Sequence, residues 1–184
     1  MTTFLAIPML ALLLPTNAVG PRPYVSHVRV RHAVLEPFLR EAVEKSATTR
    51  ALVAALDASD VIVYLEVLPG MGPSLPAGIR YAGSGGRFRY LRIALNPVNS
   101  RAQMIAMIGH ELQHAVEIAA EPTIRSRHDL QEHYERVGII GRAGNTWDTE
   151  AARDAGRIVF REVARSRAGV RTGDATPPRI EPPF

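Results

Sequence analysis

The feature that most constrains the fold is the stretch from Ser100 to Ala120, in which apolar residues recur at three- and four-residue intervals. This spacing predicts a helix with one face buried in a core. Ser100 followed by Gln103 forms a capping-box pattern at its start, and Glu121-Pro122 marks its end. The apolar stripe consists of Ile105, Ile108, Leu112, Ala115, Val116 and Ala119.

Within this helix, the run from His110 to His114 reads His-Glu-Leu-Gln-His and matches the H-E-x-x-H pattern. Two histidines four residues apart share one helix face, so both imidazoles can reach one ion at about 2.0–2.1 Å. They lie opposite the apolar stripe, and Gly109 indicates close packing beside His110. Glu111 can accept a proton from a zinc-bound water without binding the metal itself. We therefore predict one zinc ion on His110 and His114, with Glu111 as the catalytic base. The alternative is an exposed polar face with two incidental histidines.

A catalytic zinc site normally has three protein ligands and a water. The continuation His-x-x-Gly-x-x-His is absent, because Glu117 and Ala120 occupy the glycine and third-histidine positions. On a later predicted helix, Glu150 and Asp154 place two carboxylates on one face, with small alanines between them. We predict Glu150 as the third ligand and Asp154 as the acceptor that fixes the tautomer of one zinc-bound histidine. The alternative is a solvated pair of acidic residues.

H-E-x-x-H followed on a later helix by E-x-x-x-D resembles the gluzincin metallopeptidases, and the chain length is most similar to minimal gluzincin-like domains. The match covers about residues 87–165. The resemblance implies the ligand, base and supporting roles given above, and peptide-bond cleavage by a glutamate-activated, zinc-bound water. It also implies that Arg87–Leu95 is an edge strand that pairs with an extended peptide or protein substrate.

Gluzincins also supply a His, Tyr or Arg side chain that stabilises the oxyanion. Four residues are candidates for this role, and the sequence does not choose among them: His128, His133, Tyr134 and Arg157. The alternative to a zinc metallopeptidase is a catalytically inactive binding or regulatory domain, in which zinc mainly holds two helices together.

The remaining pattern predicts an α+β, zincin-like fold. Residues 32–56 have helical spacing, as one helix or as two broken near residues 46–49, and residues 61–68 form a β-branched central strand. Residues 69–86 form a loop with a short strand candidate at 79–81, and the alternating strand at 87–95 runs antiparallel to its predecessor. A short helix candidate covers residues 130–137, and a final helix runs from residue 146 or 148 to about 165. We expect a small, mostly antiparallel sheet, an active-site helix and a C-terminal helix carrying the third ligand.

The first twenty residues differ from the rest of the chain. Phe4–Leu14 is an apolar run of the length of a signal-peptide core and is too short to cross a bilayer. We expect a signal peptide at 1–20, a single zincin-like metallohydrolase domain at 21–165 and a flexible Pro/Arg-rich tail at 166–184. The expected location is exported, periplasmic or extracellular, with no stable membrane span after signal removal. A buried N-terminal helix of a cytosolic protein is the alternative.

Composition narrows the classes of function. The content of 46% hydrophobic and 22% charged residues is typical of a domain with a real core. The absence of cysteine excludes disulfides, a Cys-ligated zinc site and a thiol nucleophile. The net charge of +4 comes from arginine, because Lys45 is the only lysine. These arginines are scattered, so we expect no nucleic-acid partner, although an acidic protein partner is an alternative.

Overall fold

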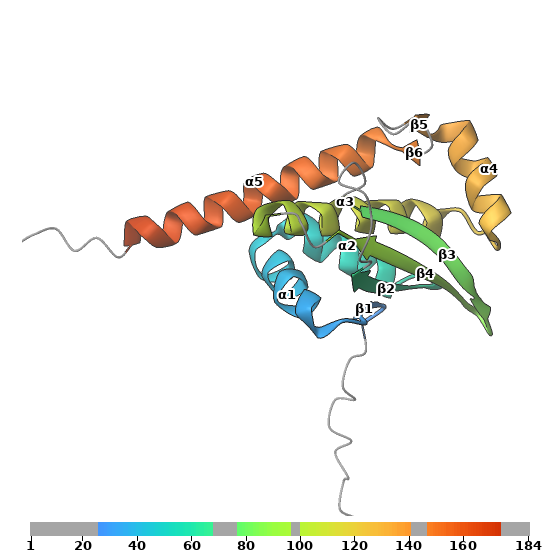
Figure 1. The fold of residues 1–184 in the computed structure, drawn as a ribbon, viewed down its shortest axis with the longest axis horizontal. Coiled ribbons are helices and arrows are strands. Elements are labelled where there is room, and N and C mark those ends of the chain that lie inside the picture. Colours follow the sequence, from blue (N-terminus) through green and yellow to red (C-terminus); the bar gives the residue numbers. More distant parts are fainter. Residues whose placement is uncertain (1–25, 68–76, 97–99, 141–146, 174–184) are drawn as a thin grey trace, which may run out of the picture.

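The computed structural model describes residues 26–67, 77–96, 100–140 and 147–173. They form an α+β fold in which α2 and α3 cover one face of a four-stranded sheet and α5 lies across the far side of α3 (Figure 1). The predicted signal peptide and residues 174–184 of the predicted tail lie outside the described residues. None of the helices in the described part has both the length and the apolar character needed to cross a bilayer.

The sheet has the order β1-β2-β4-β3, with β1 at Val28–Val30, β2 at Val61–Val67, β3 at Ala77–Gly85 and β4 at Phe88–Leu95. β2 pairs in parallel with both β1 and β4, and only β3 and β4 are antiparallel. The expectation of a mostly antiparallel sheet is therefore wrong. The crossover through α1 and α2 returns β2 parallel to β1, and the second strand of the β3–β4 hairpin lies beside β2 in the same direction.

The expectation that residues 87–95 form an edge strand is also wrong, because β4 lies between β2 and β3. The antiparallel edge belongs to β3, which is far longer than the expected 79–81. Gly78 and Gly83 lie within β3 and do not end it. The register of β3 shifts between Tyr81 and Gly83, and Gly86 at the hairpin turn has a φ of +57°. The Gly-rich composition predicted a loop where the chain forms a bulged strand.

The N-terminal helical region follows the two-helix alternative. A 3₁₀ turn at Ala33–Leu35 leads into α1 (Glu36–Lys45), and α2 spans Ala47–Asp57. The break falls at Ser46, whose extended backbone interrupts the helix while its hydroxyl accepts a hydrogen bond from the Thr49 amide.

The later helices carry the candidate site residues. α3 spans Arg101–Ala120, and the capping box predicted at Ser100 and Gln103 is confirmed. α4 covers Arg127–Val137, which is longer than expected, and α5 runs from Glu150 to Gly173, beyond the predicted end near residue 165. Two short strands, β5 (Ile139–Ile140) and β6 (Trp147–Asp148), pair between α4 and α5.

Helix α3 is covered on two sides. Its apolar stripe packs into the core against the sheet, where Ile108 and Leu112 are fully buried. On the other side it meets α5 closely, since a Cβ on Gly109 would lie 2.6 Å from Val159 Cγ2. The glycine thus permits a short interhelical distance. The side of α3 that carries the histidines therefore faces protein.

An arginine side chain joins the sheet to the C-terminal end of α3. Arg89 of β4 is fully buried and forms two hydrogen bonds with the Asp60 carboxylate, at 2.6 and 2.9 Å. The remaining guanidinium hydrogens are donated to main-chain carbonyls in and just after the last turn of α3, those of Ile118, Ala119, Glu121 and Ile124. Arg89 thereby satisfies carbonyls that a helix end otherwise leaves without partners.

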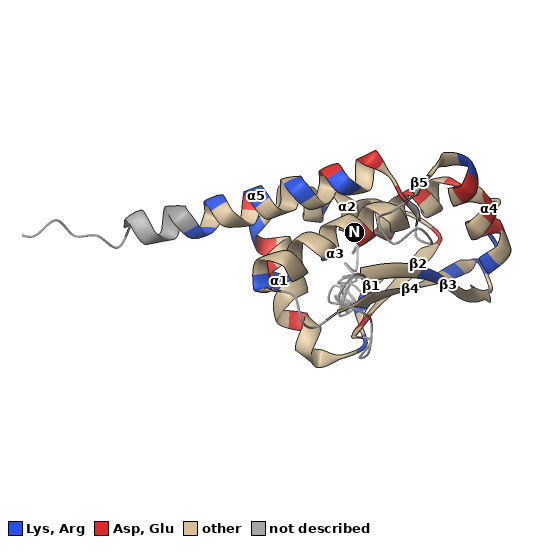
Figure 2. Cartoon of the chain, turned by 45° about the horizontal axis from the view of Figure 1, so that its top comes forward, with Lys and Arg blue, Asp and Glu red and all other residues tan. Residues whose placement is uncertain are grey.

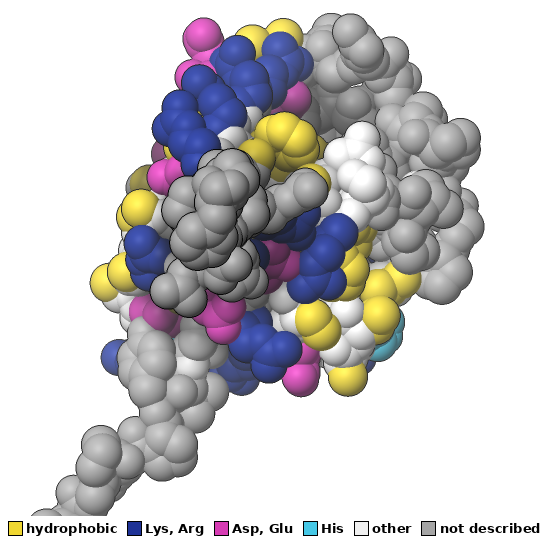
Figure 3. Space-filling model, turned by 90° about the vertical axis from the view of Figure 1, so that its left-hand side faces the viewer, with side chains coloured by type: hydrophobic (Ala, Val, Ile, Leu, Met, Phe, Trp, Pro, Cys, Tyr) yellow, Lys and Arg dark blue, Asp and Glu magenta, His cyan; other side chains and the backbone are white. Residues whose placement is uncertain are grey.

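A second charged cluster ties α1 to α3 and α5. Glu41 is 8% exposed and accepts hydrogen bonds from Lys45, Arg101 and Arg167 at 2.6–3.0 Å. Burial raises the pKa of Glu41, but the opposite effect of the three cations is larger and lowers the pKa to about 2. Figure 3 shows basic and acidic side chains intermixed on the face that contains α1 and the far end of α5. Figure 2 shows acidic residues at the start of α5 and basic residues along it.

The low pKa of Glu41 predicts a pH-dependent contribution to stability. Its folded pKa lies below the ordinary value of 4.5, so the stabilisation is present above pH 4.5 and is lost as the pH falls toward 2. The free energy of unfolding of wild type is expected to exceed that of Glu41→Gln by on the order of 1–2 kcal/mol at pH 7 and by clearly less at pH 3. Urea unfolding at both pH values measures this, with exposed Glu44→Gln as the control. An equal difference at both pH values would contradict the assignment.

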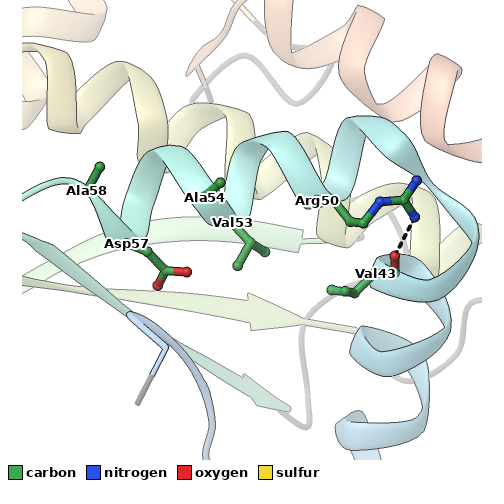
Figure 4. Close-up of a pocket in the computed structure, with 6 residues that line it drawn as sticks. All are labelled: Val43, Arg50, Val53, Ala54, Asp57 and Ala58. Atoms are coloured by element: carbon green, nitrogen blue, oxygen red, sulfur yellow. Dashed lines mark hydrogen bonds between the residues drawn. The ribbon is translucent and has the colours of Figure 1, made fainter. Parts of the chain in front are cut away.

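An open depression lies on the outer side of α1 and α2 (Figure 4). It is lined by Val43, Arg50, Val53, Ala54, Asp57 and Ala58. The Arg50 guanidinium at its rim donates to the Val43 carbonyl, and the lining includes none of the candidate site residues.

Candidate metal centre

Three side chains from two elements converge beside α3. His110 and His114 lie one turn apart on α3, and β6 brings Asp148 to them from the far end of the chain. The Oδ1 atom of Asp148 lies 3.4 Å from Nε2 of His110 and 3.5 Å from Nε2 of His114. No other group of three metal-ligating side chains was found in the described ranges.

Two of the distances within this group are compatible with a tetrahedral metal site. Ligand bonds of about 2.0–2.1 Å in a tetrahedron place the ligand atoms about 3.3–3.4 Å apart. The two distances from Asp148 Oδ1 agree with this spacing. Two imidazoles and a carboxylate are also a donor set that zinc uses in catalytic sites, where a fourth position stays open. The group could therefore hold a metal ion.

The structure places the predicted carboxylates elsewhere. Glu150 is exposed at the first position of α5 and is outside the group, while Asp154 pairs with Arg157 on the same helix. The carboxylate at the histidines is instead that of Asp148, the last residue of β6. Helix α5 begins only after Thr149, whose hydroxyl caps the helix by accepting a hydrogen bond from the Ala152 amide. A threonine ahead of Glu150 is an N-cap signal that could have shown that Asp148 precedes the helix.

The other ring nitrogen of His114 is held by two groups that sequence reasoning did not assign to it. Glu117 Oε2 lies 3.0 Å from Nδ1 of His114, and the Tyr134 hydroxyl lies 3.1 Å from the same atom. An Nδ1 that donates to Glu117 leaves Nε2 available to a metal ion. Glu117, which lies one turn beyond His114 on α3, thus makes the kind of contact that was predicted for Asp154.

Glu111 is buried in a setting that leaves its charge poorly compensated. It is 4% exposed, and its Oε2 atom has no hydrogen-bond partner. Burial raises the pKa of Glu111 to about 7. A carboxylate with a pKa near neutrality is well matched to proton transfer at neutral pH. The Glu111 carboxylate is therefore a buried group with one oxygen that no protein donor satisfies.

Burial and carboxylates act in opposite directions on the two histidines. Burial and the charge of His114 lower the pKa of His110 to about 4. Burial also lowers that of His114, but hydrogen bonds with Asp148 and Glu117 outweigh it and raise the pKa to about 9. Burial opposes ionisation of Asp148, yet His114 and Arg153 hold its pKa well below the usual range. The surroundings thus favour a positive charge on His114 and a neutral His110.

The four oxyanion candidates have different surroundings. Of these four, Tyr134 is the one that contacts His114 in the described part of the chain, through its hydroxyl and through edge-on ring packing. His133 packs against the Tyr134 ring. His128 is exposed and pairs with Glu132. Arg157 is exposed and is occupied by its ion pair with Asp154.

The assignment of the carboxylate ligand can be tested by two substitutions. Asp148→Asn is expected to weaken zinc binding about 100-fold, because an anionic ligand is replaced by a neutral amide. Glu150→Gln removes a charge two residues away and is expected to change the affinity less than twofold. Competition with a chromophoric chelator measures both. A larger loss in Glu150→Gln than in Asp148→Asn would restore Glu150 as the ligand.

No protein-family model matches the chain, and neither a curated protein nor a solved structure matches it. What the fold and the site define together is an α+β protein with a His110, His114 and Asp148 group that could hold a metal ion.

Proposed function

We propose that the chain is a zinc-dependent hydrolase, a gluzincin-like metallopeptidase in which Asp148 takes the place expected for Glu150. The observation that carries this proposal is the metal-compatible spacing of Asp148 from both histidines, beside a buried glutamate with an unpartnered oxygen. Export from the cytosol remains a prediction from residues 1–20.

The chain's own residues supply the proton transfers and the positioning. Bound zinc would polarise a substrate carbonyl and increase the acidity of a water molecule. Glu111 takes the proton from the attacking water and returns it to the leaving amine. Burial and the charge of Glu117 raise the pKa of Tyr134, so its hydroxyl stays protonated. We propose that Tyr134 helps to position His114, because its hydroxyl contacts Nδ1, on the side of the ring away from Nε2.

We propose peptides rather than small-molecule amides as the substrates, because one edge of the sheet is a strand that pairs antiparallel with its neighbour. β3 lies at one edge of the sheet, and residues of α3 pack near it. An extended peptide can add to such an edge through main-chain hydrogen bonds. This replaces β4, the strand expected from the resemblance, as the strand proposed to bind substrate.

A peptide-library cleavage assay tests the proposal. Protein equilibrated with zinc should cleave a subset of peptides, lose activity with a metal chelator and recover it when zinc is restored. An inactive zinc-stabilised domain is the second candidate, because the metal group joins α3 to the segment that starts α5. Zinc binding without cleavage of any peptide would favour that candidate over the hydrolase.

A further inference from the structure

We infer that Glu117 and Thr149 couple the metal site to the start of α5, with Glu117 as a positioning residue for His114 and Thr149 as the residue that holds Glu117. This inference rests on the proposed metal site, but it does not require catalysis. It concerns contacts made by the protein on the side of His114 that faces away from the metal position.

Glu117 is bound at both of its carboxylate oxygens. Its Oε2 lies 3.0 Å from Nδ1 of His114, and its Oε1 accepts a hydrogen bond of 2.8 Å from the Thr149 hydroxyl. The side chain is 19% exposed, so water does not fully replace either contact. A carboxylate with a hydrogen-bond partner at each oxygen has little rotational freedom. It therefore fixes the orientation of the His114 ring as well as its tautomer.

Thr149 links this carboxylate to α5. Its hydroxyl accepts a hydrogen bond of 3.1 Å from the Ala152 amide and donates one to Glu117. The same hydroxyl therefore caps the helix and holds the carboxylate. Its own amide donates to Asp148 Oδ1 at 2.8 Å, the same oxygen that faces both histidines. Two adjacent residues thus supply the metal-facing oxygen and the group that holds Glu117.

A shared segment has a thermodynamic consequence. When the first turn of α5 opens, Asp148 leaves the histidines and Glu117 loses its donor. Metal binding and closure of this turn are therefore expected to stabilise each other. A cap with only a structural role would contribute to unfolding stability but not to metal affinity.

The test compares Thr149→Val, which keeps the shape but removes the hydroxyl, with Thr149→Ser, which restores it. Thr149→Val is expected to weaken zinc affinity about tenfold, and Thr149→Ser to keep it within twofold of wild type. Glu117→Gln is expected to weaken zinc affinity by 10–100-fold. Chelator competition gives the affinities, and thermal unfolding without zinc gives the stability of each variant.

Ser46 provides a matched control. Its hydroxyl also caps a helix and donates to a carboxylate, that of Glu162, but none of its contacts involves the histidines. Ser46→Ala should lower the unfolding midpoint without changing zinc affinity by more than twofold.

Two results would overturn the coupling: Thr149→Val and Glu117→Gln lowering only the unfolding midpoint, or Ser46→Ala weakening zinc affinity as much as Thr149→Val. Wild type that binds zinc without cleaving peptides would reject the hydrolase and leave the coupling supported or refuted by these variants.

Discussion

Replacing Glu111 with Gln is expected to reduce peptide cleavage about 10³-fold while zinc affinity changes little. The amide keeps the size of the side chain but cannot accept the proton of the attacking water, and a positioned acid–base group contributes about 10²–10⁴-fold. Glu111 is not one of the three groups that converge at the metal position, so zinc binding should survive. Initial rates at saturating zinc, together with chelator competition, measure both quantities.

The folded state provides an internal check on this prediction. Glu111 is buried with an unpartnered oxygen, so removing its negative charge should not destabilise the protein at neutral pH. Glu44→Gln, the same chemical change at an exposed position on α1, is the control, with cleavage expected within a few-fold of wild type. Cleavage by Glu111→Gln at more than a tenth of the wild-type rate would remove Glu111 as the base.

Arg89→Met is expected to destabilise the fold by about 3–5 kcal/mol, because several main-chain carbonyls lose a fully buried donor and each unsatisfied buried group costs about 1–3 kcal/mol. Methionine fills much of the volume but donates no hydrogen bond. The carbonyls at the end of α3 would then be buried without partners, and Asp60 would lose its bidentate contact. Urea unfolding monitored by circular dichroism measures the change in the free energy of unfolding.

Asp60→Asn separates the two functions of Arg89. The Asp60 side chain is 30% exposed, and the guanidinium would keep its carbonyl contacts in this variant, so the loss should be clearly smaller than in Arg89→Met. A loss below about 1 kcal/mol in Arg89→Met would show that water satisfies the end of α3 and that Arg89 does not hold it.

Local signals in the sequence predicted the elements whose ends they mark. The capping box at Ser100 and Gln103 and the stop at Glu121-Pro122 define α3 closely, because these signals act within one helical turn. The alternation of residues 87–95 predicted a strand, which is confirmed as β4, and Arg89, Leu91 and Ile93 on one face of it are buried. The α+β class followed from these elements.

Sheet order and pairing direction depend on contacts between distant segments, and no local pattern reports them. The glycines of residues 77–85 predicted a loop, because the sequence does not show that a bulge between Tyr81 and Gly83 lets the strand continue. The same limit applies to the site. His110 and His114 are neighbours on one helix and were predictable, whereas Asp148 reaches them only because β6 approaches α3 before α5 begins. Tyr134 likewise reaches His114 from another helix, α4, whereas Glu117 lies one turn along α3 itself, at a spacing that the sequence shows.

The zinc content of the purified chain tests the central claim most directly. After equilibration with zinc and gel filtration, mass spectrometry of the metal should find about one zinc ion per wild-type chain. The His110→Ala/His114→Ala double variant should retain close to none, because both imidazole ligands are removed. A wild-type chain without zinc, or a double variant with as much zinc as wild type, would contradict the assignment of His110, His114 and Asp148 as a metal centre.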